Sequence, residues 1–314
     1  MSVRSIAIVG GHGQIALRLA RLLASKLSVT SIVRSEAHFP DILATGASPV
    51  VLSLEDASAA DFTRTFDEAS ADVVVFSAGS GGKGGEERTK KVDYEGAVKV
   101  FDAVEGMKHP ARLLLVSSID SRDRSKPAPA HYTEEDIESS QKQWEWIPTY
   151  MHYKLLADQN LWTRTTFPWT IVRPGLLLDT PGVGTADVGR TCVTKGIARD
   201  DVAHMLALLV ERPDAAGLAL DIVSGNELLE SALDAAIKGR LTEVYYRDAV
   251  EHGKGLPEAR MAVAGLVFLK DSGMAYVERM RQGNTNPELK AYKGVPHQFA
   301  SFDGTVSLDD QVTD

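Results

Sequence analysis

Short apolar runs alternate with longer segments of helical periodicity along the first two-thirds of the chain. The runs predict seven strands: Ser5–Gly10, Val29–Val33, Ser48–Ser53, Asp72–Ser77, Arg112–Ser117, Thr170–Arg173 and Leu218–Val223. Their centres are almost continuously apolar, which is typical of strands buried on both faces. Four segments between them predict helices: Gln14–Ser25, Glu87–Met107, Tyr150–Arg164 and Asp200–Glu211. This alternation predicts an α/β fold, a doubly wound parallel sheet with helices on both faces.

Two parts of the chain break this rhythm. Asp120–Trp146 is polar, contains prolines and is long for a connection within a compact domain, so it predicts a lid or a substrate-binding insertion. A disordered surface insertion is the alternative. Beyond Gly239 no further strand and helix unit can be recognised, although Pro257–Met280 has the apolar spacing of one or two helices. We therefore expect one large domain over 1–240 and an extension over 241–314, helical and then irregular. Pro257–Met280 is expected to cover the substrate cleft or a dimer face, and an arm from Arg281 is expected to lie over the surface or loose in solvent.

The composition narrows the classes of partner and compartment. The 314 residues include 34 basic and 43 acidic side chains, and the net charge of −9 argues against nucleic acid and anionic membranes as partners. With Cys192 alone no internal disulfide can form, which favours a reducing, cytoplasmic location. The runs Ile6–Val9 and Met261–Leu269 are too short for a signal peptide and a membrane span, respectively. No His, Cys or Asp spacing indicates a metal site.

The segment from Ile6 to Ala16 combines a strand, a glycine turn and the start of a helix. Its glycines at Gly10, Gly11 and Gly13 satisfy both G-x-G-x-x-A and G-x-x-G-x-x-A. Glycine allows the tight turn and lets the backbone N–H groups approach a pyrophosphate, which the helix N-terminus then favours electrostatically. The pattern predicts a dinucleotide site, and a glycine turn without a ligand is the alternative.

The end of the second strand bears on the choice of nucleotide. Arg34 stands where a carboxylate would otherwise accept hydrogen bonds from a ribose diol, and a guanidinium there suits a 2′-phosphate. NADP is therefore preferred to NAD. Glu36 lies two residues on and still allows NAD, and a solvated helix-cap role is the alternative for Arg34.

At this point the motifs resemble a known family. VGGHGQIA, IVRS, VVVFSAGSGG, LLLVSSID, YMHYKLLADQNL, PWTIVRPGLL, DVAHMLALLV and LALDIVSG follow one another in the order of the atypical short-chain dehydrogenase/reductase group, related to the extended and NmrA-like families. The resemblance covers about residues 3 to 240 and implies a Rossmann fold that binds NAD(P). The remaining residues of the chain lie outside it.

The resemblance also implies which residues contact the cofactor. The pyrophosphate maps onto Gly10, Gly13, Gln14 and Ile15, and the nicotinamide ribose onto Ser77, Ala78 and Gly79. The turn that faces the nicotinamide amide maps onto Pro174 and Gly175. Where the family commonly has an aspartate for the adenine amino group, this chain has Ser53 and Leu54, which leaves the adenine contact undefined.

A tyrosine and a lysine one helical turn apart carry the expected chemistry. Tyr150 and Lys154 form the only Tyr-x-x-x-Lys of the chain, and this spacing places both side chains on one helix face. A neighbouring ammonium lowers the pKa of a phenol by about 1 to 3 units and so prepares it for proton transfer to or from a carbonyl. By resemblance, Lys154 also holds the nicotinamide ribose, and Ser118, or else Ser117, binds the reacting oxygen. An aromatic ring packed over a lysine stem is the alternative.

Other residues of chemical interest are interpreted more simply. His12 is expected near phosphate as a spacer, while His152, His204 and Cys192 are assigned to packing or exposure. The tryptophans near Tyr150 either wall an apolar substrate or belong to the core; they are Trp144, Trp146 and Trp162.

These residues predict an NADP-dependent oxidoreductase that reduces a carbonyl or activated double bond of a small organic molecule. Two other classes stay open. One is a non-catalytic regulator that reports the NADP(H) ratio to a partner, and the other is a non-redox isomerase or epimerase that uses the same site. A homodimer also remains open, whereas nucleic acid and membrane are not expected as partners.

Overall fold

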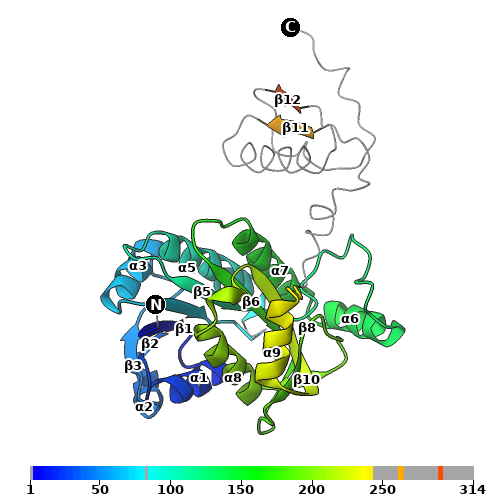
Figure 1. Cartoon of the computed structure of the whole chain (residues 1–314). Coiled ribbons are helices and arrows are strands. Elements are labelled where there is room, and N and C mark those ends of the chain that lie inside the picture. Colours follow the sequence, from blue (N-terminus) through cyan, green and yellow to red (C-terminus); the bar gives the residue numbers. More distant parts are fainter. Residues whose placement is uncertain (1–2, 82–83, 243–260, 265–288, 293–314) are drawn as a thin grey trace. The chain divides into compact units, whose positions relative to one another are not determined.

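The computed structural model describes residues 3–81, 84–242, 261–264 and 289–292. Its centre is an eight-stranded sheet in the order β3-β2-β1-β4-β5-β6-β10-β8 (Figure 1). The strands are β1 (Ser5–Val9), β2 (Ser28–Val33), β3 (Ser48–Val51), β4 (Val73–Phe76), β5 (Arg112–Val116), β6 (Trp169–Pro174), β8 (Thr185–Gly189) and β10 (Leu218–Leu228). From β3 to β10 in this order all neighbouring strands are parallel, and the order reverses beside β1, as in a Rossmann fold. The predicted doubly wound α/β fold is confirmed.

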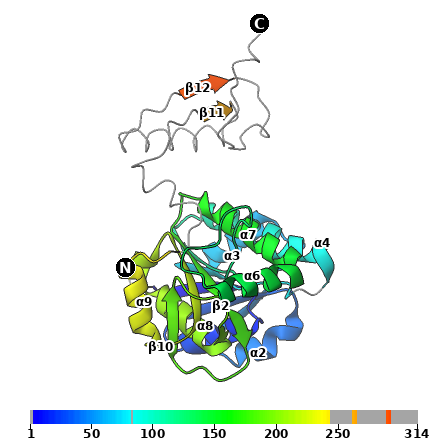
Figure 2. The same ribbon diagram turned by 90° about the vertical axis from the view of Figure 1, so that its right-hand side faces the viewer.

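Helices cover both faces of the sheet. One face carries α1 (Gln14–Leu23), α2 (Phe39–Leu43), α8 (Arg199–Val210) and α9 (Leu229–Lys238), whose apolar residues share one core cluster. The other carries α3 (Ala59–Glu68), α5 (Gly96–Glu105) and α7 (Pro148–Trp162), which share the second cluster. The two layers lie on opposite sides of the strands in both views (Figures 1 and 2).

Successive side chains of a strand point to opposite faces of the sheet, so each buried strand contributes residues to both core clusters. In β1, Ile6 and Ile8 belong to the first cluster, whereas Ala7 and Val9 belong to the second. All five residues of β1 are buried, which explains why the strand has an unbroken apolar sequence. The same pattern in β4, β5 and β6 made these strands predictable from the chain alone.

The two edges of the sheet are formed differently. At one end β8 runs antiparallel to β10, an element that the sequence prediction did not include. At the other end β3 pairs only with β2, and its second residue is Pro49. Leu52 N–H donates to the carbonyl of Val33 in β2, 2.8 Å away. The backbone N–H and C=O groups of even-numbered residues therefore point toward β2, and those of odd-numbered residues in β3 point away from the sheet. Pro49 therefore occupies an outward position on this edge.

Shorter elements complete this part of the chain. They are η1 (Glu36–His38), α4 (Gly85–Thr89), the π-helical turn η2 (Lys90–Glu95), α6 (Glu134–Trp146), β7 (Leu176–Leu178), β9 (Gly196–Ala198) and η3 (Pro213–Ala215). β7 and β9 pair as a separate parallel ribbon. The predicted helix Glu87–Met107 is in fact α4, η2 and α5 in succession, because the chain widens into a π turn in the middle.

The polar insertion is folded, so its interpretation as a disordered surface segment is wrong. Its second half forms α6, which begins with a capping box between Thr133 and Asp136. Asp136 also accepts a hydrogen bond from the N–H of Val193, 2.7 Å away, which ties α6 to the loop before β9. Ser140 is fully buried on the same helix. Whether the segment acts as a lid stays a prediction.

The chain divides into two compact units, Met1–Glu243 and Val244–Asp314. In the second, Met261–Ala264 (β11) and Leu289–Tyr292 (β12) form a parallel pair. The prediction of helices over Pro257–Met280 is therefore wrong for Met261–Ala264, where strand pairing takes the place of helical bonds. The rest of that segment, and the arm expected from Arg281, lie outside the described residues apart from β12.

Candidate cofactor groove and active site

The glycine turn after β1 needs its glycines for two separate reasons. Gly10 has φ of +82°, and a Cβ on it would lie 2.6 Å from the Cα of Ala78. A Cβ on Gly11 would lie 2.7 Å from the Cβ of Ser31. A side chain at Gly10 would collide with the loop after β4 and one at Gly11 with β2, so these two positions must be glycine.

The turn leads directly into α1, whose N-terminus is open. Gly13 is its N-cap residue and supplies no side-chain hydrogen bond, and no acidic residue occupies the first turn. The backbone N–H groups of Gln14 and Ile15 therefore lie at an uncapped, electropositive helix end. Bare amides at such an end favour a phosphate group, so these residues fit the pyrophosphate of a dinucleotide.

A groove of about 330 Å³ runs from this turn across the carboxyl ends of β2, β3 and β4. It brings together eight of the predicted cofactor residues: Gly10, Gly13, Arg34, Ser53, Leu54, Ser77, Ala78 and Gly79. It also includes residues to which sequence reasoning gave no part in cofactor binding: His38, Glu55, Ser80 and Arg88. His12, interpreted as a spacer near phosphate, lines it as well. Its place at the strand ends beside the reversal of strand order is where open α/β sheets bind ligands.

The wall where the family commonly has an aspartate is built differently here. The Ser53 hydroxyl donates to Asp56 at 2.7 Å and accepts from the N–H of Glu55, which closes a local turn. Glu55 faces Arg88 of α4 across 3.6 Å. The carboxylate of Glu55 and the guanidinium of Arg88 thus line this wall in place of the aspartate. Both residues come later in the chain than Ser53, where the family commonly has the aspartate.

Lys154 is fixed from two directions. Its side chain is 4% exposed, and its ammonium lies 3.3 Å from the carboxylate of Asp93 and 3.3 Å from the carbonyl of Val116 at the end of β5. Asp93 comes from the π turn η2 and also accepts the N–H of Ser80 at 3.0 Å. Asp93 therefore joins the lysine to the rim of the cofactor groove. A π turn displaces its residues from helical register, which is why spacing alone did not reveal Asp93.

Tyr150 lies beside this lysine, as the four-residue spacing predicts. The Lys154 ammonium is 5.5 Å from the centre of the Tyr150 ring. Burial raises the pKa of Tyr150, and although Lys154 opposes this effect, Asp93 and Asp158 reinforce it. The expected lowering of the pKa is therefore wrong for the protein without ligands, because desolvation of the phenolate outweighs the ammonium. Burial would lower the pKa of Lys154, but Tyr150 and Asp93 raise it above its usual value, so the lysine stays charged.

The two serines after β5 have different surroundings. The Ser118 hydroxyl lies 3.8 Å from the sulfur of Met151, one residue after Tyr150. Ser117 is buried close to Asp158, which pairs with Arg173 at 2.8 Å. Burial raises the pKa of Asp158, while Arg173 and Ser117 oppose this rise. Both serines therefore face α7, but Ser118 lies beside Met151, next to Tyr150, whereas Ser117 lies further along the helix at Asp158.

Pro174 ends β6, and Gly175 follows it next to the loop after β5. The carbonyl of Pro174 accepts the N–H of Ile119, and Gly175 donates its own N–H to Ile222. A Cβ on Gly175 would lie 2.5 Å from the carbonyl oxygen of Lys195. The turn is thus locked between neighbouring strands, with its N–H already bonded within the protein.

Asp120, two residues after Ser118, anchors the insertion. It is buried, has φ of +58°, and lies within hydrogen-bond distance of four donors. These donors are the side chains of Arg122 at 2.8 Å, Ser140 at 2.7 Å, Trp144 at 3.1 Å and Tyr132 at 3.2 Å. Asp120 therefore docks α6 against the loop that follows β5.

The tryptophans, His152 and Cys192 lie in different surroundings. Of the three tryptophans proposed as a substrate wall, Trp144 bonds to Asp120, Trp146 is 84% exposed, and Trp162 packs against Trp169 in the core. His152 is exposed next to Tyr153, and Cys192 packs partly buried beside Val193.

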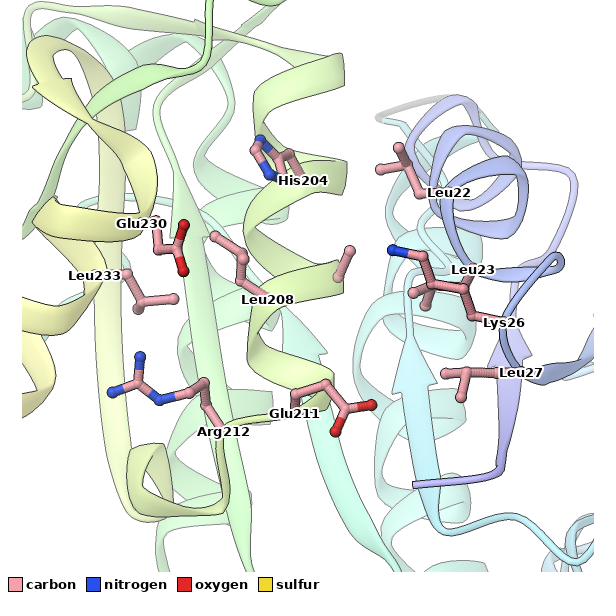
Figure 3. Close-up of a pocket in the computed structure, with 11 residues that line it drawn as sticks. Leu22, Leu23, Lys26, Leu27, His204, Leu208, Glu211, Arg212, Glu230 and Leu233 are labelled. Carbon is pink, nitrogen blue, oxygen red and sulfur yellow. The ribbon is translucent and has the colours of Figure 1, made fainter. Parts of the chain in front are cut away.

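A second hollow of about 370 Å³ lies between α1, α8 and α9 (Figure 3). Leucines of all three helices line it, together with Lys26, His204, Glu211 and Glu230. It contains none of the predicted cofactor or catalytic residues. Within the part of the chain that the structure describes, no cluster of three or more metal-binding side chains occurs, and no helix is long and apolar enough to cross a bilayer.

Comparison with known proteins supports the assignment of the groove to a dinucleotide. The NAD(P)H-binding family model matches residues 10–213. The chain belongs to this family. It is 38% identical to a UPF0659 protein of Schizosaccharomyces pombe over 76% of its own length and 97% of that protein. The predicted membership of an NAD(P)-binding family is thereby confirmed, and the assignment to the short-chain dehydrogenase/reductase group stays a prediction.

Two further relatives carry functional names. The chain is 29% identical to a protein of Bacillus subtilis named an uncharacterised sugar epimerase, over 73% of this chain and 98% of that one. Among solved structures, a putative NAD-dependent epimerase/dehydratase from Bacillus halodurans is 29% identical and superimposes with a TM-score of 0.61. That match covers 74% of this chain and 99% of the other. The family and fold are therefore shared with proteins named as epimerases.

Proposed function

We propose that the protein is an NADP(H)-dependent oxidoreductase that reduces a carbonyl or an activated double bond of a small organic molecule. The observation that carries this proposal is the pair of Tyr150 and Lys154, linked through Asp93 to the rim of the dinucleotide groove. A buried, charged lysine beside a phenol and next to a nucleotide site is costly unless it serves chemistry.

The bound cofactor supplies the hydride. Lys154, held by Asp93, orients the nicotinamide ribose and favours the phenolate of Tyr150 once the proton has left. Tyr150 donates that proton to the substrate oxygen or carbon, and Ser118 binds the reacting oxygen. Burial keeps Tyr150 protonated before the reaction, which suits a proton donor in the reductive direction.

The choice of NADP(H) is supported by charge. Arg34 is exposed at the end of β2, lines the groove, and forms no ion pair with the described residues. A free guanidinium at this position suits the 2′-phosphate, which NAD(H) lacks.

Replacing the phenol tests the assignment. We expect Tyr150→Phe to lower kcat by about 100- to 10,000-fold in an NADPH oxidation assay over a panel of carbonyl substrates, because it removes the proton donor and leaves the ring. The dissociation constant for NADPH, measured by calorimetry, should change little. His152→Ala, an exposed change on the same helix, is the control and should retain activity. Full activity in Tyr150→Phe would remove Tyr150 from the mechanism.

An epimerase is the second candidate, favoured by the names of the relatives. The oxidised cofactor, bound in the same groove, would then accept a hydride from the substrate and return it to the other face, while Tyr150 would take up the hydroxyl proton and give it back. The two functions differ in cofactor balance, since an epimerase turns over sugar substrates with no net change in NADP(H) absorbance. Isomerised product without net oxidation of NADPH would decide for the epimerase.

A further inference from the structure

Two histidines from different elements stack face to face at the groove. His12 comes from the glycine turn, and His38 ends η1 after β2. Their ring centroids lie 4.0 Å apart and the ring planes differ by 2°. Both rings line the groove together with Arg34. The proposed reaction uses neither histidine.

The ring nitrogens of the pair are not equally engaged. Nε2 of His12 lies 2.7 Å from the carboxylate of Asp41 in α2. Nδ1 of His38 is shielded from water and makes no hydrogen bond within the described part of the chain. Buried polar atoms in folded proteins nearly always have a partner, so this nitrogen indicates an interaction that a ligand completes.

The charges around His38 keep it neutral without a ligand. Burial, His12 and Arg34 together hold the pKa of His38 below its usual value, and Asp41 alone opposes them. Glu36 precedes His38 in η1, while Arg88 and Glu55 face each other on another wall of the groove. Two parallel imidazolium rings at this distance would repel, so a second proton needs a nearby anion.

We propose that His12 and His38 form, with Arg34, a proton-coupled reader of the 2′-phosphate of NADP(H). The phosphate approaches Arg34, and the imidazole pair takes up a proton as it binds. Selectivity for NADP(H) over NAD(H) then depends on pH. This inference rests on the proposed use of NADP(H) and adds its regulation by protons.

The sign follows from linkage. A phosphate dianion next to His38 favours its charged form, so the bound pKa lies above the free pKa. As pH falls through the interval between these two values, the complex carries the proton and the free protein does not, so binding takes up a proton and NADPH binds more tightly. Below the free pKa both states carry the proton, and the affinity levels off. Above the bound pKa His38 is neutral in both states, and it no longer adds to the contribution of Arg34. NADH has no 2′-phosphate, so its affinity should not follow this pattern.

Calorimetry of the full-length protein tests the inference. NADPH and NADH are titrated at about pH 6 and about pH 8, in phosphate-free buffers with different ionisation enthalpies, which reveal proton uptake. We expect uptake with NADPH alone and an NADPH affinity about tenfold higher at the lower pH. Adenosine 2′,5′-bisphosphate should behave like NADPH, and 5′-AMP like NADH, whereas inorganic phosphate should compete only weakly.

Three variants locate the proton. His38→Gln and His12→Gln retain a polar side chain but cannot titrate near neutral pH, so each should lose most of the proton uptake and the pH effect on NADPH. His204→Gln, an exposed histidine on α8 outside the groove, is the matched control and should behave like the unaltered protein. NADH binding to each variant reports whether the groove is intact.

The outcomes separate this inference from the proposed function. Tighter NADPH than NADH binding without proton uptake would overturn the histidine reader and leave the NADP(H) preference standing. Uptake that persists in both glutamine variants would also overturn it. Equal affinity for NADPH and NADH at both pH values would overturn the cofactor preference and the reader together.

Discussion

At the scale of single residues, backbone conformation decides whether the groove exists. Gly10 combines a positive φ with close contact to the backbone of Ala78, so neither strain nor collision can be relieved by moving a flexible side chain. This position therefore tests the pyrophosphate assignment most directly.

We expect Gly10→Ala to weaken NADPH binding by at least about tenfold, because an L side chain is strained at this φ and displaces the loop that carries Ala78. Calorimetric titration measures the effect. Gly81→Ala is the control, since Gly81 also has a positive φ but a Cβ on it would have no atom within 4 Å. Equal affinity in both variants would show that close approach of the turn is not needed.

Much of the site was accessible from the sequence because it is local. The glycine turn and the pair of Tyr150 and Lys154 can be recognised from residues close together in the chain. In the structure the glycines share the groove, and Tyr150 lies beside Lys154. Asp93 and Arg88 were missed, since they reach the site only through tertiary contacts of η2 and α4. The pKa of Tyr150 was predicted with the wrong sign, because burial is not visible in a spacing.

At the scale of elements, continuous apolar runs identified the parallel strands, whereas short or polar elements were missed. α3 and α6 both begin with a capping box, at Ser58 with Asp61 and at Thr133 with Asp136. This signal was present in the sequence and would have located both helices. β8 has no comparable signal, since its pairing with β10 depends on a distant segment.

The docking of α6 can be tested at its anchor. Asp120→Ala removes the acceptor of several buried donors and leaves the guanidinium of Arg122 without its partner. We expect a loss of about 3 to 5 kcal/mol in the free energy of unfolding, measured with urea and followed by tryptophan fluorescence. Glu138→Ala, which removes an exposed carboxylate of the same helix that lies 3.6 Å from the Lys142 ammonium, should change stability little. Equal stabilities would show that Asp120 does not hold the insertion in place.

At the scale of the molecule, stability in acid depends on carboxylates at turns and helix starts. Bonds to Thr133 and Val193 overcome the effect of burial and hold the pKa of Asp136 below its usual value. Bonds to Gly182 and Arg18 lower the pKa of Asp200, and those to Arg212 lower that of Asp214. Groups with lowered pKa values stabilise the fold above about pH 4, and this stabilisation is lost as pH falls through their folded values.

We therefore expect the free energy of unfolding to decline below about pH 4, by up to about 1.4 kcal/mol per pH unit for each group that titrates. Asp158 acts in the opposite direction, because its raised pKa favours the protonated fold. Urea unfolding across this range measures the decline. Asp136→Asn should show a shallower slope than the unaltered protein, and an identical slope would remove Asp136 from the acid response.

The proline on β3 has a consequence for the behaviour of the protein in concentrated solution. An outer strand with unused N–H groups invites a neighbouring molecule to extend the sheet, which is a common start of fibril growth. Pro49 deletes one of the few amides that this margin would offer. The edge of the sheet at β3 therefore resists the addition of a strand from another molecule because Pro49 has no N–H, and this resistance does not depend on charge or salt.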